Sequence, residues 1–249
     1  MIITRTPFRV TLGGGGTDLP SYYSQNGGFI FSAGINKYMF LNVNRSIVDD
    51  LIRVKYSQSE TVEHIEQLNH DIARESLRMM GIEQAIEVIS MAYIPAGTGL
   101  GSSSCYAVGL LNALHTLKRD YVSLHNLAEE ACSVEIDTLK KPIGKQDQYM
   151  AAYGGLTVLE IDKEGKVDVR PANISGSTVD ELQRNMMLFF TGFSRKSSEI
   201  LSQQSKATEK KDQKVVDSLN YIKELGYQIL EAVESDNLTD FGLLMHKHW

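Results

Sequence analysis

PAGTGLGSSSCYAVGLLNAL, residues 95–114, runs from three glycines through three serines into an almost wholly apolar segment. Its apolar residues surround most of the helical circumference and predict a buried helix from about 103 to 118. A glycine-rich loop at the start of a helix presents unpaired backbone N–H groups at the positive end of the helix dipole, which favours phosphate. The stretch therefore predicts a phosphate-binding loop, and a tight turn with an N-cap and no ligand is the alternative.

The motif differs from the two commonest nucleotide-binding loops. No GKS or GKT closes it, as a Walker loop requires, and the GxGxxG spacing of a dinucleotide site fits poorly. Ser102, Ser103 and Ser104 fall in the first helical turn, where a hydroxyl can cap the helix, contact a phosphate or ligate Mg²⁺. The sequence leaves these three roles open.

A second helix, predicted from about 123 to 139, carries a carboxylate where an apolar residue is expected. Ser123 is its predicted N-cap, and Pro142 lies beyond its end. Stepping 100° per residue places Glu135 in the middle of the apolar face. An isolated buried charge costs several kcal/mol, so Glu135 needs a cation. That cation is either an Arg or Lys from elsewhere or a metal ion.

Three further polar residues stand beside glycines or inside apolar patterns. Asp147, in PIGKQDQYMAAYGG, is predicted either to accept a proton from a substrate hydroxyl or to cap the helix formed by QYMAAY. Asp18 follows four glycines and is predicted to bind polyol hydroxyls or to form an Asp-containing turn. Arg9, in a strand-like segment, is predicted either to point its charge into the ligand-binding cleft or to face solvent from an edge strand.

Strand and helix periods alternate along the chain without a Pro/Ser-rich linker, which indicates an α+β fold. The first strand-like segment contains Pro7 and is predicted to be interrupted there. The segments predicted as strands are 2–12, 27–46, 51–57, 84–94, 154–161, 166–172 and 185–192. The remaining predicted helices are 61–80, about 212–234, and a last one in NLTDFGLLMHKHW.

Composition excludes several classes of partner. The formal net charge is −6 and no Lys/Arg-dense face is present, so neither nucleic acid nor a membrane is the expected partner. The sequence lacks both a signal-peptide pattern and an apolar run long enough to span a membrane, and we expect a cytoplasmic protein. Cys105 and Cys132 lie in apolar helical patterns and are predicted to be buried thiols without chemistry.

Taken in order, these motifs resemble the GHMP kinase superfamily of small-molecule kinases. TPFRVTLGGGGTDLPSYY resembles the first motif in its sugar-kinase form, and PAGTGLGSSSCYAVGLLNAL is similar to the central phosphate-binding motif. VEIDTLKKPIGKQDQYMAAYGGL resembles the segment that supplies the metal ligand and the base. GGGGTDL, QDQYMAAYGG and TGFSRKSSEI point more narrowly to the heptose 7-phosphate kinases and the related fucokinases.

The resemblance implies roles for individual residues. Ser103 and Glu135 would hold Mg²⁺, while Asp147, together with Arg9, would serve catalysis. The residues implied in binding the ATP phosphates are Pro95, Gly97, Gly99, Leu100, Gly101, Ser102, Ser103 and Ser104. The residues implied in binding the sugar are Gly15, Gly16, Thr17 and Asp18. We expect Arg195 to bind the 7-phosphate because its guanidinium forms a bidentate fork, and a surface arginine at a helix start is the alternative.

The resemblance also implies an activity. We expect an ATP-dependent kinase that phosphorylates the anomeric hydroxyl of D-glycero-D-manno-heptose 7-phosphate, in the synthesis of nucleotide-activated heptose for surface polysaccharide. A kinase for L-fucose or another sugar is one alternative. A non-catalytic relative that senses sugar and nucleotide is the other, although Ser103, Glu135 and Asp147 together count against it because a sensor needs no base. A homo-oligomer is left open.

The implied fold has two domains, with an N-terminal ATP-binding α+β domain over residues 1–180 and a ferredoxin-like C-terminal domain starting at 181. The third motif of the family, a GAGxGG-type loop, is not found before the last residue, Trp249. We therefore expect the C-terminal domain, residues 181–249, to be incomplete in this chain. This expectation leaves the activity of the 249-residue chain in doubt.

Overall fold

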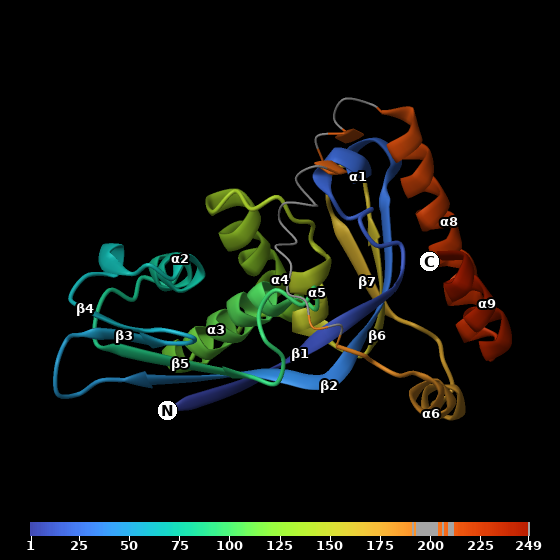
Figure 1. Cartoon of the computed structure of the whole chain (residues 1–249). Helices are drawn as coiled ribbons and strands as arrows, with labels where there is room; N and C mark the ends of the chain where they lie inside the picture. The colour runs from blue at the N-terminus through green and yellow to red at the C-terminus, as the bar shows by residue number, and fades with distance from the viewer. Residues whose placement is uncertain (191, 193–203, 206, 209–211, 249) are drawn as a thin grey trace. The chain divides into compact units, whose positions relative to one another are not determined.

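The computed structural model describes residues 1–190, 192, 204–205, 207–208 and 212–248 (Figure 1). They form two compact units that alternate along the chain. Unit 1 comprises residues 1–9, 35–141 and 147–154, and unit 2 comprises residues 10–34, 142–146 and the chain from 155 onward. The mixed α+β class predicted from the sequence is confirmed. The division into domains at residues 180 and 181 stays a prediction.

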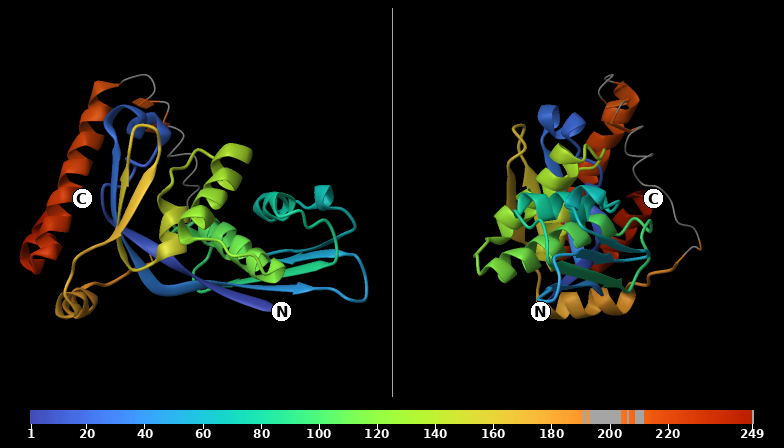
Figure 2. Two further views of the ribbon diagram at one scale, coloured as in Figure 1. Left: turned by 180° about the vertical axis from the view of Figure 1, so that it is seen from behind. Right: turned by 90° about the vertical axis from the view of Figure 1, so that its left-hand side faces the viewer.

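Unit 1 has a layer of strands on one side and a layer of helices on the other (Figures 1 and 2). The C-terminal end of β2 (Gly28–Arg45) pairs antiparallel with β5 (Ile86–Ala92), and β5 pairs parallel with β3 (Ile52–Lys55). β3 forms a hairpin-like pair with β4 (Ser59–Val62). The helical elements of unit 1 are η1 (Ile65–Gln67), α2 (Asp71–Met79), α3 (Ser102–Lys118), α4 (Leu124–Cys132), η2 (Ser133–Thr138) and most of α5 (Gln146–Tyr153).

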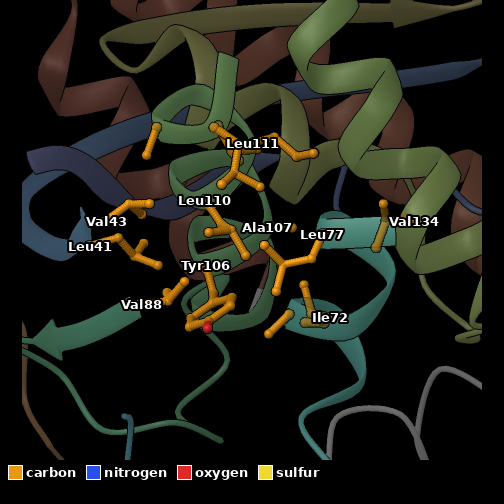
Figure 3. Close-up of a cluster of buried hydrophobic side chains, with 14 of the residues drawn as sticks. Leu41, Val43, Ile72, Leu77, Val88, Tyr106, Ala107, Leu110, Leu111 and Val134 are labelled. Atoms are coloured by element: carbon orange, nitrogen blue, oxygen red, sulfur yellow. The ribbon is translucent and has the colours of Figure 1, made fainter. Parts of the chain in front are cut away.

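The core of unit 1 forms around α3. Figure 3 shows Leu110 and Leu111 of α3 between the strand residues Leu41 and Val43 and the helix residue Leu77. These five side chains are fully buried. The predicted helix of residues 103–118 is confirmed as α3. Apolar side chains cover most of its circumference, which explains why it lies in the centre of the core.

Gly109 brings α3 close to the strands of unit 1. A Cβ atom at this position would lie 2.7 Å from both Leu41 Cδ1 and Thr6 Oγ1, closer than ordinary van der Waals contact. The Thr4 hydroxyl also donates a hydrogen bond of 2.9 Å to the Gly109 carbonyl oxygen. Glycine is therefore required here for close packing.

We expect Gly109→Ala to destabilise the protein by about 1–3 kcal/mol, because the added methyl group overpacks a buried contact. Gly242, in α9 (Leu238–His248), is the matched control, because no atom lies within 4 Å of the Cβ position there. Gly242→Ala should stabilise by roughly 0.5–1 kcal/mol through helix propensity alone. Urea unfolding of the two variants measures both signs, and stabilisation by Gly109→Ala would contradict the packing argument.

The first strand continues through Pro7. β1 (Ile2–Gly13) is uninterrupted, so the predicted break at Pro7 was wrong. β1 is hydrogen-bonded to β2 and to no other strand of the described residues. A strand with one neighbour leaves alternate N–H groups outside the ladder, and a proline is tolerated at such a position.

The predicted helix over residues 61–80 was only partly right. The structure has β4 and η1 before α2, which begins at Asp71. His70 ends the preceding extended segment because its Nδ1 accepts a hydrogen bond of 3.2 Å from the Ala73 N–H and so caps α2. A histidine cap is easily missed in a sequence, because Ser, Thr, Asp and Asn are the usual caps.

Unit 2 combines the other ends of β1 and β2 with the rest of the chain. β2 pairs antiparallel with β6 (Leu156–Ile161), and β6 forms an antiparallel hairpin with β7 (Val167–Pro171). Its helices for which both ends are described include α1 (Pro20–Asn26), α6 (Gly176–Asn185), α8 (Gln213–Glu234) and α9, and the predicted helices near the C-terminus are confirmed as α8 and α9.

A second core joins these elements. Phe29, Phe31 and Val158 from the strands pack against Ile229 and Val233 of α8. The segment 185–192 that the sequence predicts as a strand contains no strand in its described part, residues 185–190 and 192, and Phe189 and Phe190 are exposed. An apolar segment becomes a strand only when another strand pairs with it, and none does so within the described residues. The described helices include none with the length and apolar composition that a membrane span requires.

Candidate active site

The glycine loop precedes α3 as the sequence predicts. Gly97, Gly99 and Gly101 have φ values of 80°, 76° and 82°, a region that favours glycine. Gly101 is the N-cap of α3, and the first hydrogen bond of the helix joins the Cys105 N–H to the Gly101 carbonyl oxygen at 2.9 Å. The N–H groups of Ser102 to Ser104 have no intrahelical acceptor, as at any helix start. No serine side chain caps the helix, so the capping role that the sequence left open for the Ser102, Ser103 and Ser104 hydroxyls was wrong.

The loop residues differ in exposure. Pro95, Gly97 and Gly99 are exposed, whereas Gly101 is buried and the Leu100 side chain packs against the core of unit 1. The loop thus has an exposed backbone and an anchored end, which suits binding through N–H groups rather than side chains.

Glu135 is fully buried, as the helical pattern predicts. Its Oε1 accepts a hydrogen bond from the Ser103 hydroxyl. Its Oε2 accepts one from the Ser104 hydroxyl at 2.6 Å and another from the Gln148 side-chain amide at 2.8 Å. Two serines at the start of α3 therefore converge on one carboxylate.

The backbone around Glu135 is not α-helical. The predicted helix over residues 123–139 begins at the N-cap Ser123, as expected, but α4 ends at Cys132 and η2 continues as a π-helix. A π-helical turn inserts an extra residue into the hydrogen-bond ladder and is frequent at functional sites. The burial of Glu135 was predicted correctly, although the 100° step does not describe η2.

The donors around Glu135 fit a magnesium ion. Mg²⁺ prefers oxygen ligands and is usually bound by one or two carboxylates together with phosphate oxygens and water. Glu135 and Ser103 supply a carboxylate and a hydroxyl at the start of α3, where phosphate is expected. The part of the chain that the structure describes holds no group of three or more His, Cys, Asp or Glu residues suited to a metal.

A lysine also lies near Glu135. Lys141 Nζ is 3.7 Å from Glu135 Oε1 and 3.5 Å from Asp71 Oδ2, and it donates a hydrogen bond of 3.4 Å to the Ser103 hydroxyl. Lys141 could therefore be the lysine that balances the charge of Glu135. The oxygens of Glu135 and Ser103 could equally be the ligands of a metal ion. Both alternatives from the sequence stay open.

Arg9 and Asp147 form the second part of the site in unit 1. Arg9 donates from Nε to Asp147 Oδ1 at 2.7 Å, and its Nη2 lies 2.6 Å from the same oxygen. Arg9 Nη1 donates to the Gly99 carbonyl oxygen at 2.7 Å. The guanidinium thus ties Asp147 to the glycine loop, and the alternative that Arg9 faces solvent was wrong because its side chain is 14% exposed.

Asp147 lies in the first turn of α5 with one oxygen held by Arg9. A Cβ atom on Gly101 would lie 3.5 Å from Asp147 Oδ2, so this oxygen lies beside the start of α3. No hydrogen bond joins the Asp147 side chain to the N–H groups of α5 in the described structure. Instead, the N–H of Gln146 donates to Asp18 Oδ2 at 3.0 Å.

In unit 2, the segment before Asp18 is a tight loop. Gly14 and Gly16 have φ values of 79° and 86°. The Thr17 hydroxyl lies 2.8 Å from the carbonyl oxygens of Gly14 and Phe29, so this fully buried side chain stabilises the loop. Gly15 is half-buried in the same loop. Roles of these residues in sugar binding stay predictions.

The sequence did not single out Gln148 or Lys141. A glutamine between Asp147 and the apolar residues Tyr149 and Met150 was the available signal, since a polar side chain in a buried helix needs a partner. Lys141 carried no such signal because it lies in a polar turn. The predicted phosphate ligand Arg195 lies outside the described residues.

The two cysteines are buried thiols, as predicted. Cys105 lies in α3 beside the site, and its thiol donates to the Pro7 carbonyl oxygen at 3.1 Å. Burial, and next the nearby Asp147 charge, raise the pKa of this thiol far above its usual range. Cys105 therefore stays protonated and is no candidate nucleophile.

Known proteins resemble the part of the chain that carries this site. Residues 62–155 match the family profile of the GHMP kinases N terminal domain. The matched range includes the glycine loop, Glu135 and Asp147. D-glycero-α-D-manno-heptose 7-phosphate kinase from Campylobacter jejuni is 24% identical over 100% of this chain and 76% of the relative. L-fucokinase/L-fucose-1-P guanylyltransferase from Bacteroides fragilis is 25% identical over 98% of this chain, which spans 29% of that larger protein.

The fold agrees with this match. The structure resembles the crystal structure of a D-glycero-D-manno-heptose 1-phosphate kinase from Bacteroides thetaiotaomicron with a TM-score of 0.85 and 24% identity, over 100% of this chain and 78% of the other. It also resembles a crystal structure of mevalonate kinase with a TM-score of 0.68 and 19% identity. Residues 62–155 therefore match the N-terminal domain of the GHMP kinases, in agreement with the resemblance that the sequence motifs carry.

Proposed function

We propose that this protein is a sugar kinase that transfers the γ-phosphoryl group of ATP to the anomeric hydroxyl of D-glycero-D-manno-heptose 7-phosphate. The observation that carries the proposal is the convergence at the start of α3, where Ser103 meets Glu135 and the Arg9–Asp147 pair meets the glycine loop. Similarity to a heptose 7-phosphate kinase supports the acceptor.

The glycine loop would bind the triphosphate through its backbone. Residues 97–101 and the first turn of α3 present N–H groups at the positive end of a helix, and such groups neutralise phosphate oxygens without needing to reorganise. The buried contacts of α3 hold these donors in place. Ser103 and Glu135 would hold Mg²⁺, which neutralises charge on the phosphate oxygens of ATP.

Asp147 would accept the proton of the attacking hydroxyl. Its Oδ1 is held by Arg9, whereas no described residue donates a hydrogen bond to its Oδ2. As the anomeric oxygen forms its bond to the γ-phosphorus, the bond from that phosphorus to the bridging oxygen of ADP breaks, and the hydroxyl proton moves to Asp147 Oδ2. Arg9 would keep the carboxylate aimed and place positive charge beside the transferred group.

Asp18 would bind hydroxyl groups of the sugar. It is 7% exposed, and the Gln146 N–H fixes one of its oxygens. Gln146 directly precedes the proposed base, Asp147, in the chain. A displacement of Asp18 would therefore also move Gln146, the residue beside that base. Gly15, Gly16 and Thr17 would shape the loop that carries Asp18.

We expect Gly144→Ala to lower kcat/KM for the sugar by about 100-fold, because a misplacement of roughly 1 Å costs that much. A Cβ atom on Gly144 would lie 2.1 Å from Asp18 Oδ2 and 2.7 Å from the Asp18 carbonyl oxygen. KM for ATP should stay unchanged. Gly176→Ala is the control, since no atom lies within 4 Å of its Cβ position. An unchanged kcat/KM for the sugar in natively folded Gly144→Ala would remove Asp18 from sugar binding.

A second acceptor is favoured by a specific observation, the similarity to an L-fucokinase. The test is an ATP-turnover assay with the full-length protein, MgATP and a panel of acceptors that includes heptose 7-phosphate, heptose, L-fucose and galactose. We expect heptose 7-phosphate to give the highest kcat/KM, with the new phosphate on the anomeric oxygen by ³¹P NMR. Preference for L-fucose would replace the acceptor. Nucleotide binding without turnover on any sugar would indicate a sensor.

A further inference from the structure

The two oxygens of the Glu135 carboxylate have different surroundings. Oε2 receives hydrogen bonds from Ser104 and Gln148, whose side chains are 1% and 0% exposed. Oε1 is bordered by the exposed Ser103 and by Lys141, which is one quarter exposed. One oxygen is therefore enclosed by neutral buried donors, and the other lies on the side that solvent reaches.

The amide of Gln148 has one partner and one unsatisfied atom. Its Nε2 donates to Glu135, whereas its Oε1 is buried and accepts no hydrogen bond from the described residues. Turning the amide over would place its oxygen against the carboxylate, which is repulsive, so Glu135 determines the orientation. An unsatisfied buried acceptor is destabilising, and an apolar side chain of the same length would avoid that cost. Packing stability alone does not explain a glutamine here.

We infer that Ser104 and Gln148 are positioning residues that hold Glu135 Oε2 and thereby present Oε1, beside Ser103, to the divalent cation. This inference rests on the proposed function. Residues that hydrogen-bond a metal-ligating side chain orient it and tune its affinity, and their loss typically costs about 10- to 100-fold in metal affinity. Ser104 thereby receives a role through its hydroxyl that differs from the phosphate contact implied by the sequence.

The inference requires that the two residues act through Glu135 and not through ATP. Neither side chain is exposed, and both donate to the same oxygen, so each should affect metal binding and leave metal-free nucleotide binding unchanged. A purely structural role would instead lower the stability of the protein and weaken both kinds of binding together.

The experiment compares Gln148→Met and Ser104→Ala with the wild type of the full-length protein. Mn²⁺ serves as the probe, titrated in the presence of ADP and followed by electron paramagnetic resonance. We expect each variant to raise the Kd for Mn²⁺ by about 10-fold or more, with the Kd for ADP without metal and the Tm nearly unchanged. In a Glu135→Gln background, Gln148→Met should weaken Mn²⁺ binding no further, because the carboxylate that Gln148 positions is already absent.

Gln228→Met is the matched control, since Gln228 Nε2 also donates to a glutamate, Glu224 Oε1 at 3.2 Å, but on the exposed surface of α8. It should leave Mn²⁺ binding unchanged. Wild-type Mn²⁺ affinity in both Gln148→Met and Ser104→Ala would overturn the inference and leave the proposed function standing. A wild-type protein that neither binds Mn²⁺ with ADP nor phosphorylates any sugar would overturn both. A lower Tm with parallel losses of ADP and Mn²⁺ binding would show a structural role.

Discussion

Asp147→Asn is expected to lower kcat for sugar phosphorylation by about 10²- to 10⁴-fold, the usual contribution of a general base. The substitution keeps the shape of the side chain and removes the proton acceptor. The amide oxygen of the substituted side chain can still accept from Arg9, so the tie between Arg9 and the glycine loop should survive. KM for ATP should therefore change little, and steady-state kinetics with both substrates varied measures the difference.

Asp137→Asn is the control for this prediction. Asp137 is exposed in η2, and its side chain has no hydrogen bond or ion pair among the described residues. The Asp137→Asn substitution removes the same charge from unit 1 without changing a contact of Arg9 or of the glycine loop. If Asp147→Asn turns over at a rate close to wild type, Asp147 is not the base. Equal losses in the two variants would indicate a general effect of charge.

Glu135→Gln is expected to raise the Mg²⁺ concentration needed for half-maximal activity by roughly 100-fold, because it removes the charge of a proposed metal ligand. The amide fills the same buried space, and its oxygen can still accept from Ser104 or Gln148. Titration of activity with Mg²⁺ at fixed ATP measures the effect, and Mn²⁺ binding by electron paramagnetic resonance measures it without turnover.

The same variant decides between the two cations that the sequence left open for Glu135. If Lys141 alone balances the buried charge, the metal titration of Glu135→Gln should match that of the wild type, while the protein loses stability. Glu83→Gln is the control, since Glu83 is exposed and has no ion pair among the described residues. A wild-type metal titration of Glu135→Gln would remove Glu135 from the proposed Mg²⁺ site.

Much of the site could be predicted because its signals are local. The glycine loop and α3 follow from neighbouring residues, since backbone freedom at glycine and apolar periodicity are properties of short segments. The burial of Glu135 followed from the pattern of its own helix. The cap at His70 was missed because histidine is not one of the usual capping residues, and the continuous strand through Pro7 was missed because the free edge of β1 is set outside its own segment.

The sequence by itself determined that a glycine-rich loop precedes a buried helix and that the buried carboxylate of Glu135 needs partners. Only the tertiary structure decided which partners these are. Ser104 and Glu135 are 31 residues apart, Gln148 and Glu135 are 13 apart, and Arg9 and Asp147 are 138 apart. A hydrogen bond between such residues depends on how the helices and strands of unit 1 pack, and no local pattern encodes that distance. The carboxylates were visible in the sequence, and folding selected the groups that hold them.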